Sequence, residues 1–282
     1  MGKMVAIVYM VAGLSSRFQS RIKQFTKITD NETLIEYSLN QSLSAGFNKI
    51  IFIIGKKTET TFKEKFGNNY KRIPVYYALQ DFDINKRDRP WGTVDALCSV
   101  LTIIKEPFVV CNGDDVYGKN SFKILYDHLI NEQLKNNQKN KENNKENATL
   151  GYKLGNVLPE NGQVNRGIFK INKNYITKIE EVFNIEKNNL SEKNLNSESL
   201  CSMNIFALFP ETIHKLNFIL TEFKEKNKND RKIECLLPVE LSNLIQTKKI
   251  KMKIYPTSDK WFGVTNPGDE IIIRDILKKQ NL

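Results

Sequence analysis

No stretch of this 282-residue chain is long and apolar enough to span a membrane, which takes about 18 consecutive apolar residues. The first apolar run covers only residues 4–11, and Arg17, Arg21 and Lys23 follow it closely. Because Lys3 precedes this run and small residues end it, a secretory signal peptide is the rival interpretation. The short run and the crowded cations favour a cytoplasmic protein with no membrane partner.

Cysteine is also scarce, and the four cysteines are far apart: Cys98, Cys111, Cys201 and Cys235. No two of them have the close spacing of a structural metal site. Three lie in apolar segments, where a free thiol packs like a small hydrophobic side chain. We therefore expect buried free thiols rather than a metal cluster.

A compact basic stripe interleaved with aromatic residues is missing as well. The chain carries 43 Lys and Arg against 32 Asp and Glu, a formal charge of +11, which would suit a nucleic-acid partner. The excess is mostly lysine scattered among asparagines, as in residues 136–147. An enrichment in Asn and Lys along a whole chain is better explained by codon bias than by a binding partner. We therefore expect no nucleic-acid partner.

What the chain does contain is an alternation of strand and helix patterns. Residues 4–11 form an unbroken apolar run that predicts a strand buried on both faces. Thr33 and Glu36 have the capping-box spacing of a helix start, and Gly46 would end that helix. A strand at 49–54, a helix at 59–66 and a strand at 73–77 complete a β-α-β-α-β pattern. This pattern predicts an α/β fold with a mainly parallel sheet.

The rest of the chain continues the pattern without an internal repeat, so we expect one domain over residues 1–282. Low-complexity loops are expected near 136–147 and 184–199. Further strands are predicted at 107–111, 149–156, 163–171, 175–182, 200–209 and 250–255. Further helices are predicted from Gly92, at 121–134, 211–226 and 234–247, and from residue 267.

A phosphate-binding loop is predicted directly after the first strand. The loop residues are Ala12, Gly13, Leu14, Ser15 and Ser16. Such a loop lets the backbone approach a ligand closely, with its N–H groups free to bind an anion. Arg17 and Lys23 follow and would add a guanidinium fork and a point charge for a polyphosphate. On this segment alone, a turn with two solvated cations explains the residues equally well.

Gln80 and Gly92 are candidates for binding a nucleobase. Gln80 follows the predicted strand at 73–77, at the sheet edge that also carries the loop at residues 12–16. A glutamine amide donates and accepts hydrogen bonds, so it can pair with the edge of a base. Alone, Gln80 is better explained as a surface residue. Gly92 and Thr93 open a helix, where a glycine allows a flat ring to lie against the backbone.

Asp114 and Asp115 form a candidate magnesium site, because they directly follow the buried strand at 107–111. Carboxylate oxygens that face a triphosphate are the ligands that Mg²⁺ takes. An acidic turn is the plain alternative. Successive residues that leave a strand point to opposite sides, so we expect only one of the two, Asp114, to face the ligand.

Four segments, taken together, resemble the motifs of the sugar-phosphate nucleotidyltransferases. V-A-G-L-S-S-R with Lys23 resembles their A-A-G-x-G-[ST]-R…K signature, and Gln80 with P-W-G-T-V-D-A-L resembles their base-binding segments. N-G-D-D-V-Y-G resembles their metal loop, and W-F-G-V-T-N-P-G-D resembles their C-terminal W-x-D-x-G-T-P-x-D. Order and spacing agree over nearly the whole chain. The likeness is to the glucose-1-phosphate uridylyl- and thymidylyltransferase group.

The resemblance implies a Rossmann-like mixed sheet, mainly parallel and flanked by helices, with a smaller sugar-side β region. It implies an enzyme that joins UTP, dTTP or CTP to a sugar 1-phosphate, with Mg²⁺, and releases pyrophosphate. Arg17 and the Gly13 loop would hold the departing phosphates, and Lys23 would offset charge at the α-phosphate. Asp114 would hold Mg²⁺, and Gln80 with Gly92 would bind the base.

The sugar side is matched more loosely. Gly151, Asn165 and Asn204 lie where the family contacts the sugar. The family's second metal-binding Asp falls at Phe262 or Gly263 here, and Asp259 just upstream is the substitute that we expect. The sugar-side E-K-P motif is also altered, because the segment at 179–182, I-E-E-V, lacks the lysine.

Three other functions stay open at this point. A cytidylyltransferase acting on a non-sugar alcohol phosphate shares the first motif, including the Lys-Gln that follows the loop. A GT-A-type glycosyltransferase shares the strand followed by Asp-Asp but does not need Arg17 and Lys23 at this spacing. A catalytically weak nucleotide-binding relative would fit the missing tail Asp. The choice of nucleotide and sugar, and whether the chain forms a homo-oligomer, are left open.

Overall fold

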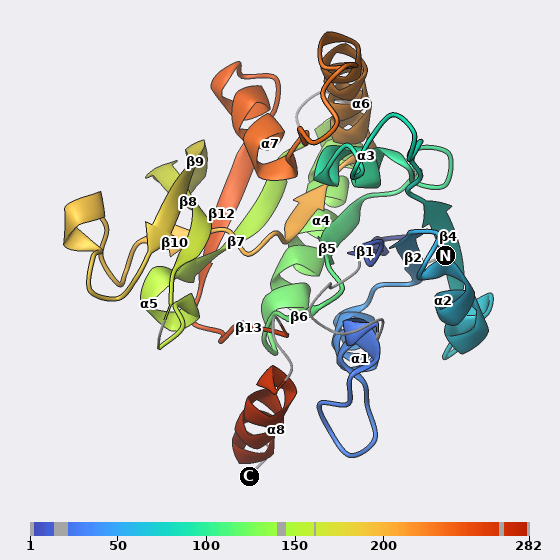
Figure 1. Cartoon of the computed structure of the whole chain (residues 1–282), viewed down its shortest axis with the longest axis horizontal. Helices are drawn as coiled ribbons and strands as arrows, with labels where there is room; N and C mark the ends of the chain where they lie inside the picture. The colour runs from blue at the N-terminus through green and yellow to red at the C-terminus, as the bar shows by residue number, and fades with distance from the viewer. Residues whose placement is uncertain (1–2, 14–21, 140–144, 161, 265–267, 281–282) are drawn as a thin grey trace.

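Figure 1 shows the protein as a computed structural model, which describes residues 3–13, 22–139, 145–160, 162–264 and 268–280. Its strands are β1 (Ala6–Met10), β2 (Lys49–Ile54), β3 (Asn69–Tyr70), β4 (Ile73–Leu79), β5 (Phe108–Asn112), β6 (Asp115–Val116), β7 (Asn147–Lys153), β8 (Val164–Asn172), β9 (Tyr175–Ile185), β10 (Leu200–Cys201), β11 (Phe206–Leu208), β12 (Met252–Thr257) and β13 (Phe262–Gly263). Its α-helices are α1 (Leu34–Ala45), α2 (Glu59–Phe66), α3 (Thr93–Cys98), α4 (Ser121–Lys139), α5 (Leu154–Val157), α6 (Pro210–Lys226), α7 (Leu237–Gln246) and α8 (Asp269–Gln280). Short 3₁₀ helices are η2 (Lys23–Phe25) and η3 (Ser191–Lys193).

Most of the strands form one eleven-stranded sheet, in the order β10-β8-β9-β12-β7-β11-β5-β1-β2-β4-β3. The neighbours β5, β1, β2 and β4 are parallel, which confirms the prediction of an α/β fold built on a parallel sheet. β11 runs antiparallel to β5 and β7, and the antiparallel pair β8 and β9 extends the other half. This half lies at the left of Figure 1 with α5. β6 and β13 pair outside the large sheet.

The strand β1 is buried on both faces, as its apolar run predicts, and its side chains divide between two cores. Val5, Ile7 and Tyr9 belong to the core that also contains residues of α1, α2 and α4. Ala6 and Val8 belong to the core on the opposite face, with residues of α3, α6 and α7. The sheet is therefore a central layer between two helical layers, and the carboxyl end of β1 lies in the middle of one sheet edge.

Helix α1 has both predicted ends. Thr33 Oγ1 accepts a hydrogen bond from the Glu36 N–H, and the Glu36 carboxylate accepts one from the Thr33 N–H at 3.0 Å. Gly46 ends the helix with φ +118°, and a Cβ there would lie 2.6 Å from the Tyr126 ring. A third small core packs the C-terminal helix α8 against the start of α1 and the β6–β13 pair. Figure 1 shows α8 at one end of the molecule, beneath these elements.

The expectation of one long strand at 200–209 is wrong. The run is split into β10, which pairs with β8 and β7, and β11, which pairs with β5 and β7. Between them Asn204 has φ +55°, and the Ser202 N–H bonds the carbonyl of Gly167 in β8. An apolar run shows burial but not a change of pairing partner, which is why the sequence pattern misses the break.

Smaller differences lie at helix ends and in the polar segments. Helix α3 ends at Cys98, before the apolar residues Leu101 and Ile104, and α7 begins three residues later than predicted. Helix α4 extends to Lys139, into the segment expected to be a loop. The segment at 184–199 contains η3 and the buried Leu195. All four cysteines are buried free thiols, as predicted. Within the described ranges, no helix is both long and apolar enough to cross a membrane.

Candidate active site

A cavity of about 380 Å³ opens at the carboxyl ends of the parallel strands, where α/β sheets bind ligands. It collects residues from several separate segments: Met10, Ala12, Gly13, Lys23, Gln24, Gln80, Pro90, Gly92, Thr93, Ala96, Asn112, Asp114 and Glu234. The structure thus brings seven sequence-predicted residues together, namely Ala12, Gly13, Lys23, Gln80, Gly92, Thr93 and Asp114. The other predicted residues of the phosphate loop, Leu14, Ser15, Ser16 and Arg17, lie outside the described residues.

Glycines allow the strand ends beside this cavity to approach one another closely. A Cβ at Gly55 would lie 2.9 Å from the Ala12 carbonyl oxygen, and one at Gly113 would lie 2.2 Å from Val11 Cγ1. The Gly113 N–H bonds the Met10 carbonyl at 3.1 Å. A Cβ at Gly13 would meet no described residue within 4 Å, and Gly13 lines the cavity.

Lys23 and Asp114 form an ion pair at the wall of the cavity. Their side chains are 17% and 25% exposed, so both charges can be reached from the cavity. The pair joins η2 to the turn after β5, and each charge balances the other in the absence of ligand. A polyphosphate offers Lys23 a stronger partner, and a divalent cation offers one to Asp114.

Asp114 and Asp115 point to different surroundings, as expected from their adjacent positions. Asp115 is buried and accepts hydrogen bonds from Asn112 Nδ2, at 2.9 Å, and from the Tyr117 hydroxyl, at 3.2 Å. Burial, together with the negative charge of Asp114, raises the pKa of Asp115 to about 7. Asp115 thus supports the turn from inside, whereas Asp114 lines the cavity.

Gln80 and Gly92 lie together on the opposite wall. Gln80 Nε2 donates to the Gly92 carbonyl and to Asp95 Oδ2, each at 3.0 Å. Gly92 has φ +100°, and a Cβ there would lie 2.5 Å from the Cys235 carbonyl oxygen, so glycine is required. Trp91 is held elsewhere, with the Arg87 guanidinium 3.5 Å from its ring centroid. Trp91 also packs against the core that contains residues of α3 and α6, and it does not line the cavity.

Asp259, the expected second metal ligand, lies at the start of helix α4. Its Oδ2 accepts hydrogen bonds from the Asn120 N–H at 2.8 Å and the Ser121 hydroxyl at 3.2 Å. It lines a different cavity from Asp114, one of about 840 Å³ between α1, α4 and the segment after β12. In the described ranges, no group of three or more His, Cys, Asp or Glu could hold a metal. The two expected ligands thus line different cavities, and their joint binding of a metal stays a prediction.

The three residues expected to contact a sugar do not line the cavity either. Gly151 is buried in β7, where a Cβ would lie 2.8 Å from Ile254. Asn165 Oδ1 accepts a hydrogen bond from the Asn184 N–H at 3.0 Å, and Asn204 forms the bend between β10 and β11. They lie in the half of the sheet expected to hold a sugar, and a contact with the sugar stays a prediction.

Arg166 on β8 is a cation that the sequence reasoning missed. Its guanidinium lies 5.5 Å from the ring centroid of Trp261, and burial lowers the pKa of Arg166. Arg166 Nε and Trp261 Nε1 are buried and have no hydrogen-bond partner among the described residues. Gly263 pairs with Asp115 between β13 and β6, and a Cβ at Gly263 would lie 2.7 Å from the Trp261 ring, so Trp261 packs beside this pair. A lone Arg in a polar strand gives no sequence signal for this placement.

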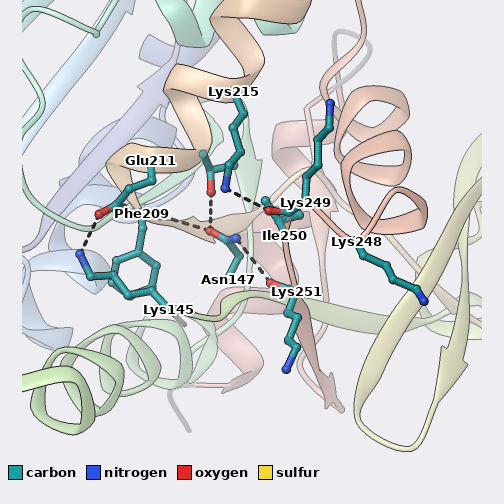
Figure 2. Close-up of a pocket in the computed structure, with 10 residues that line it drawn as sticks. Lys145, Asn147, Phe209, Glu211, Lys215, Lys248, Lys249, Ile250 and Lys251 are labelled. Atoms are coloured by element: carbon teal, nitrogen blue, oxygen red, sulfur yellow. Dashed lines mark hydrogen bonds and ion pairs between the residues drawn. The ribbon is translucent and has the colours of Figure 1, made fainter. Parts of the chain in front are cut away.

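A third, smaller cavity of about 170 Å³ lies at the start of β7 and β12, at the sheet edge opposite the Lys23 and Asp114 cavity (Figure 2). Five lysines line it, but Figure 2 shows them pointing in different directions. Lys145 pairs with Glu211 at 2.8 Å, and Asn147 Oδ1 accepts from the Phe209 N–H and the Thr212 hydroxyl. Lys145, Glu211 and Asn147 are thus already paired within the chain, and none of the predicted site residues lines this cavity.

The chain matches the family model described as "Nucleotidyl transferase" over residues 18–181. No curated protein matches it. Among solved structures, the inositol-1-phosphate CTP transferase from T. maritima is similar with a TM-score of 0.66 and 14% identity, covering 99% of this chain and 96% of that one.

Two further structures have a TM-score of 0.64 each. One is a UDP-glucose pyrophosphorylase complexed with UDP-glucose, at 17% identity, covering 98% of this chain and 99% of that one. The other is described as a glucose-1-phosphate thymidylyltransferase from Bacillus anthracis, at 14% identity, covering 96% of this chain and 94% of that one. Identities this low establish the common fold alone.

Proposed function

Because the chain belongs to the nucleotidyl transferase family, we propose that it joins a pyrimidine nucleoside triphosphate to a sugar 1-phosphate. The products are a nucleoside diphosphate sugar and pyrophosphate. The observation that carries the proposal is the cavity, which holds Gly13, Lys23, Gln80, Gly92 and Asp114 from separate segments of the chain. An ordinary structural role for each of these residues would not gather them around one open space.

The triphosphate would lie along the end of β1, with its base toward Gln80 and Gly92. The small residues Ala12 and Gly13 leave backbone N–H groups accessible to phosphate oxygens. Arg17 would bind the two phosphates that depart. This orientation places the α-phosphorus between Lys23 and Asp114. Lys23, and a cation held by Asp114, would there offset the negative charge of the reacting phosphates.

Asp114 suits Mg²⁺, because a partly exposed carboxylate that faces a phosphate-sized cavity is a hard oxygen ligand. A Mg²⁺ ion bound there would neutralise charge on the phosphates. Asn112 and Asp115 hold the turn that carries Asp114 through their mutual hydrogen bond of 2.9 Å. Asp114 with substrate phosphates and water gives an acceptable set of ligands, because Mg²⁺ commonly keeps several waters.

The reaction is an in-line displacement at the α-phosphorus. A phosphate oxygen of the sugar 1-phosphate forms a new P–O bond, and the bond from the α-phosphorus to pyrophosphate breaks. Lys23 donates hydrogen bonds to oxygens on which negative charge accumulates, so it stabilises the transition state more than the ground state. The enzyme's contribution is thus mainly positioning and charge stabilisation.

Arg166 would bind the phosphate of the second substrate. Its buried Nε and the neighbouring Trp261 Nε1 are two donors without acceptors among the described residues, and an anionic oxygen would satisfy them. Arg166 pairs across the sheet with Val182, in the segment that lacks the family's lysine. Arg166 on β8 can therefore supply the positive charge that the family's lysine would supply on β9.

Pyrophosphate release tests the proposed function directly. The full-length protein with Mg²⁺ is supplied with each common nucleoside triphosphate in combination with hexose 1-phosphates. Turnover with a pyrimidine nucleotide and a hexose 1-phosphate is expected. Turnover only with CTP and a non-sugar alcohol phosphate would show that the second substrate is an alcohol phosphate and not a sugar 1-phosphate. Binding to a DNA duplex with a steep salt dependence, and no turnover, would overturn the proposal.

A further inference from the structure

The side-chain amide of Gln80 is held in one orientation by two groups that can only accept hydrogen bonds. Its Nε2 donates one hydrogen to the Gly92 carbonyl and the other to Asp95 Oδ2, both at 3.0 Å. Neither partner carries a hydrogen, so the NH₂ group must face them and the carbonyl oxygen cannot. Gln80 lines the cavity, so the atom left for a ligand is its Oε1.

Asp95 is the residue that enforces this orientation. It lies in the first turn of α3, is only 8% exposed, and is paired through Oδ1 with the Lys224 ammonium from α6. The two oxygens of the carboxylate thus have one partner each, the Lys224 ammonium and the Gln80 NH₂. A flipped Gln80 would place its oxygen against this carboxylate, so the low solvent access makes the flip costly.

Gln80 therefore offers the base only a hydrogen-bond acceptor, its Oε1, whereas a free amide could offer either a donor or an acceptor. Uracil and thymine present the N3–H donor at the centre of their pairing edge. Cytosine has an unprotonated N3 there, so two acceptors would face each other. The donor of cytosine is its N4 amino group, at one end of the pairing edge. This group can reach Gln80 Oε1 only if the cytosine ring shifts sideways from the position that uracil takes. The same contrast separates guanine, with N1–H, from adenine.

We propose that Asp95 is a positioning residue that fixes Gln80 as a hydrogen-bond acceptor and so selects uracil or thymine nucleotides over cytosine nucleotides. The inference rests on the proposed function, since it assigns the base side of the same cavity. It narrows the pyrimidine substrates to those with a ring N–H. Lys224 supports the selection indirectly, by holding the Asp95 carboxylate in place.

The test compares UTP and CTP, which differ at this edge and share ribose and triphosphate. We expect kcat/KM with a fixed hexose 1-phosphate to favour UTP by roughly 10-fold, because CTP leaves the partly buried Gln80 acceptor unpaired. In Asp95→Asn, the amide at position 95 can present either an oxygen or an NH₂. Only the Gly92 carbonyl then opposes a flip of Gln80, so the ratio should fall clearly below that of the parent, mainly through the KM for CTP. The KM for the hexose 1-phosphate should not change.

Asp88→Asn is the matched control, because it removes another carboxylate from an ion pair, that with Arg231, at an exposed position. It should keep the UTP preference of the parent. A preference for CTP in the parent, or an unchanged UTP to CTP ratio in Asp95→Asn, would overturn the inference. If Asp95→Asn does not fold, the parent's own ratio, together with the GTP to ATP ratio, decides the question.

Nucleotide binding separates this inference from the proposed function. Thermal stabilisation by UTP and by CTP, each with Mg²⁺ and without a second substrate, measures base preference in the absence of turnover. If UTP alone stabilises the protein and no substrate pair releases pyrophosphate, the base selection is supported and the proposed reaction is contradicted. If the protein turns over UTP and CTP equally well, the proposed reaction is supported and the base selection is contradicted.

Discussion

The carboxylate of Asp259 accepts a hydrogen bond from the backbone N–H of Asn120, at 2.8 Å, immediately before α4 begins. Its other oxygen accepts one from the Asn120 side chain at 3.2 Å. A carboxylate in this position satisfies free N–H groups and favours the helix dipole. Asp259 thus ties the segment after β12 to the start of α4, a role that its expected function as a metal ligand did not foresee.

We therefore expect Asp259→Ala to act on stability. Loss of a cap of this kind typically costs about 1 kcal/mol, so the melting temperature should fall by a few degrees. The Mg²⁺ concentration for half-maximal turnover should match that of the parent. A raised Mg²⁺ requirement with an unchanged melting temperature would instead restore Asp259 as a ligand.

Asp114→Asn should have the opposite effects, because Asp114 faces the cavity and its partner Lys23 is partly exposed. We expect the Mg²⁺ needed for half-maximal turnover to rise several-fold, since an amide is a weaker ligand than a carboxylate. Magnesium titrations at saturating substrates measure the change. Asp115→Asn is the matched control. If it alone shifted the Mg²⁺ dependence, the assignment of the two neighbours would be reversed.

Lys23→Ala should lower kcat by about 100-fold, because loss of one transition-state contact costs about 3 kcal/mol. The melting temperature should change little, since the ion pair with Asp114 is partly exposed and contributes weakly to stability. Lys27→Ala, at an exposed lysine nearby, serves as the control and should keep the parent rate. Normal turnover of Lys23→Ala would exclude Lys23 from the reaction.

Arg166→Met should raise the KM for the sugar 1-phosphate by roughly 10- to 100-fold, the usual value of a charge-assisted hydrogen bond in a buried site. The KM for the nucleotide should stay near that of the parent, because Arg166 lies on β8, away from Gln80. Arg166→Lys should recover part of the affinity. Equal increases in both KM values would indicate a general loss of structure rather than a substrate contact.

His128 should make stability depend on pH. It is buried, its ring nitrogens bond the Tyr255 hydroxyl and the Glu146 carbonyl, and burial lowers the pKa of His128 from 6.5. Below pH 6.5 the unfolded chain binds a proton that the folded chain excludes, so stability falls as the pH falls. The loss is up to about 1.4 kcal/mol for each pH unit.

Urea unfolding of the parent and of His128→Gln at pH 7.5 and pH 5.5 measures this effect. The parent should lose more stability than the variant on acidification, because other titrating groups contribute equally to both proteins. Equal losses in the two proteins would show that His128 becomes protonated in the folded state.

Much of the nucleotide half was predictable because its signals are local. The capping box of Thr33 and Glu36, the glycine at position 46 and the apolar run of β2 each determine one element from adjacent residues. Once the strands are parallel, their carboxyl ends meet at one edge. The grouping of Gly13, Gln80 and Asp114 then follows from order along the chain alone.

The remaining features depend on contacts between distant segments. Asp95 and Lys224 are 129 positions apart, and Asp259 and Asn120 are 139 apart, so no local pattern connects them. The break between β10 and β11 has the same origin, because only the neighbouring strands decide where pairing changes. Arg166 was missed since its role comes from Trp261, far along the chain.

The place of β11 between β5 and β7 has a consequence for synthesis of the chain. β1, β2, β4 and β5 can pair as they leave the ribosome, whereas β7 finds its sheet partners only among β10, β11 and β12. A nascent chain shorter than about 206 residues leaves both β5 and β7 without their shared neighbour. Open strand edges promote aggregation, so we expect the nascent chain to be prone to aggregation between translation of β7 and of β11.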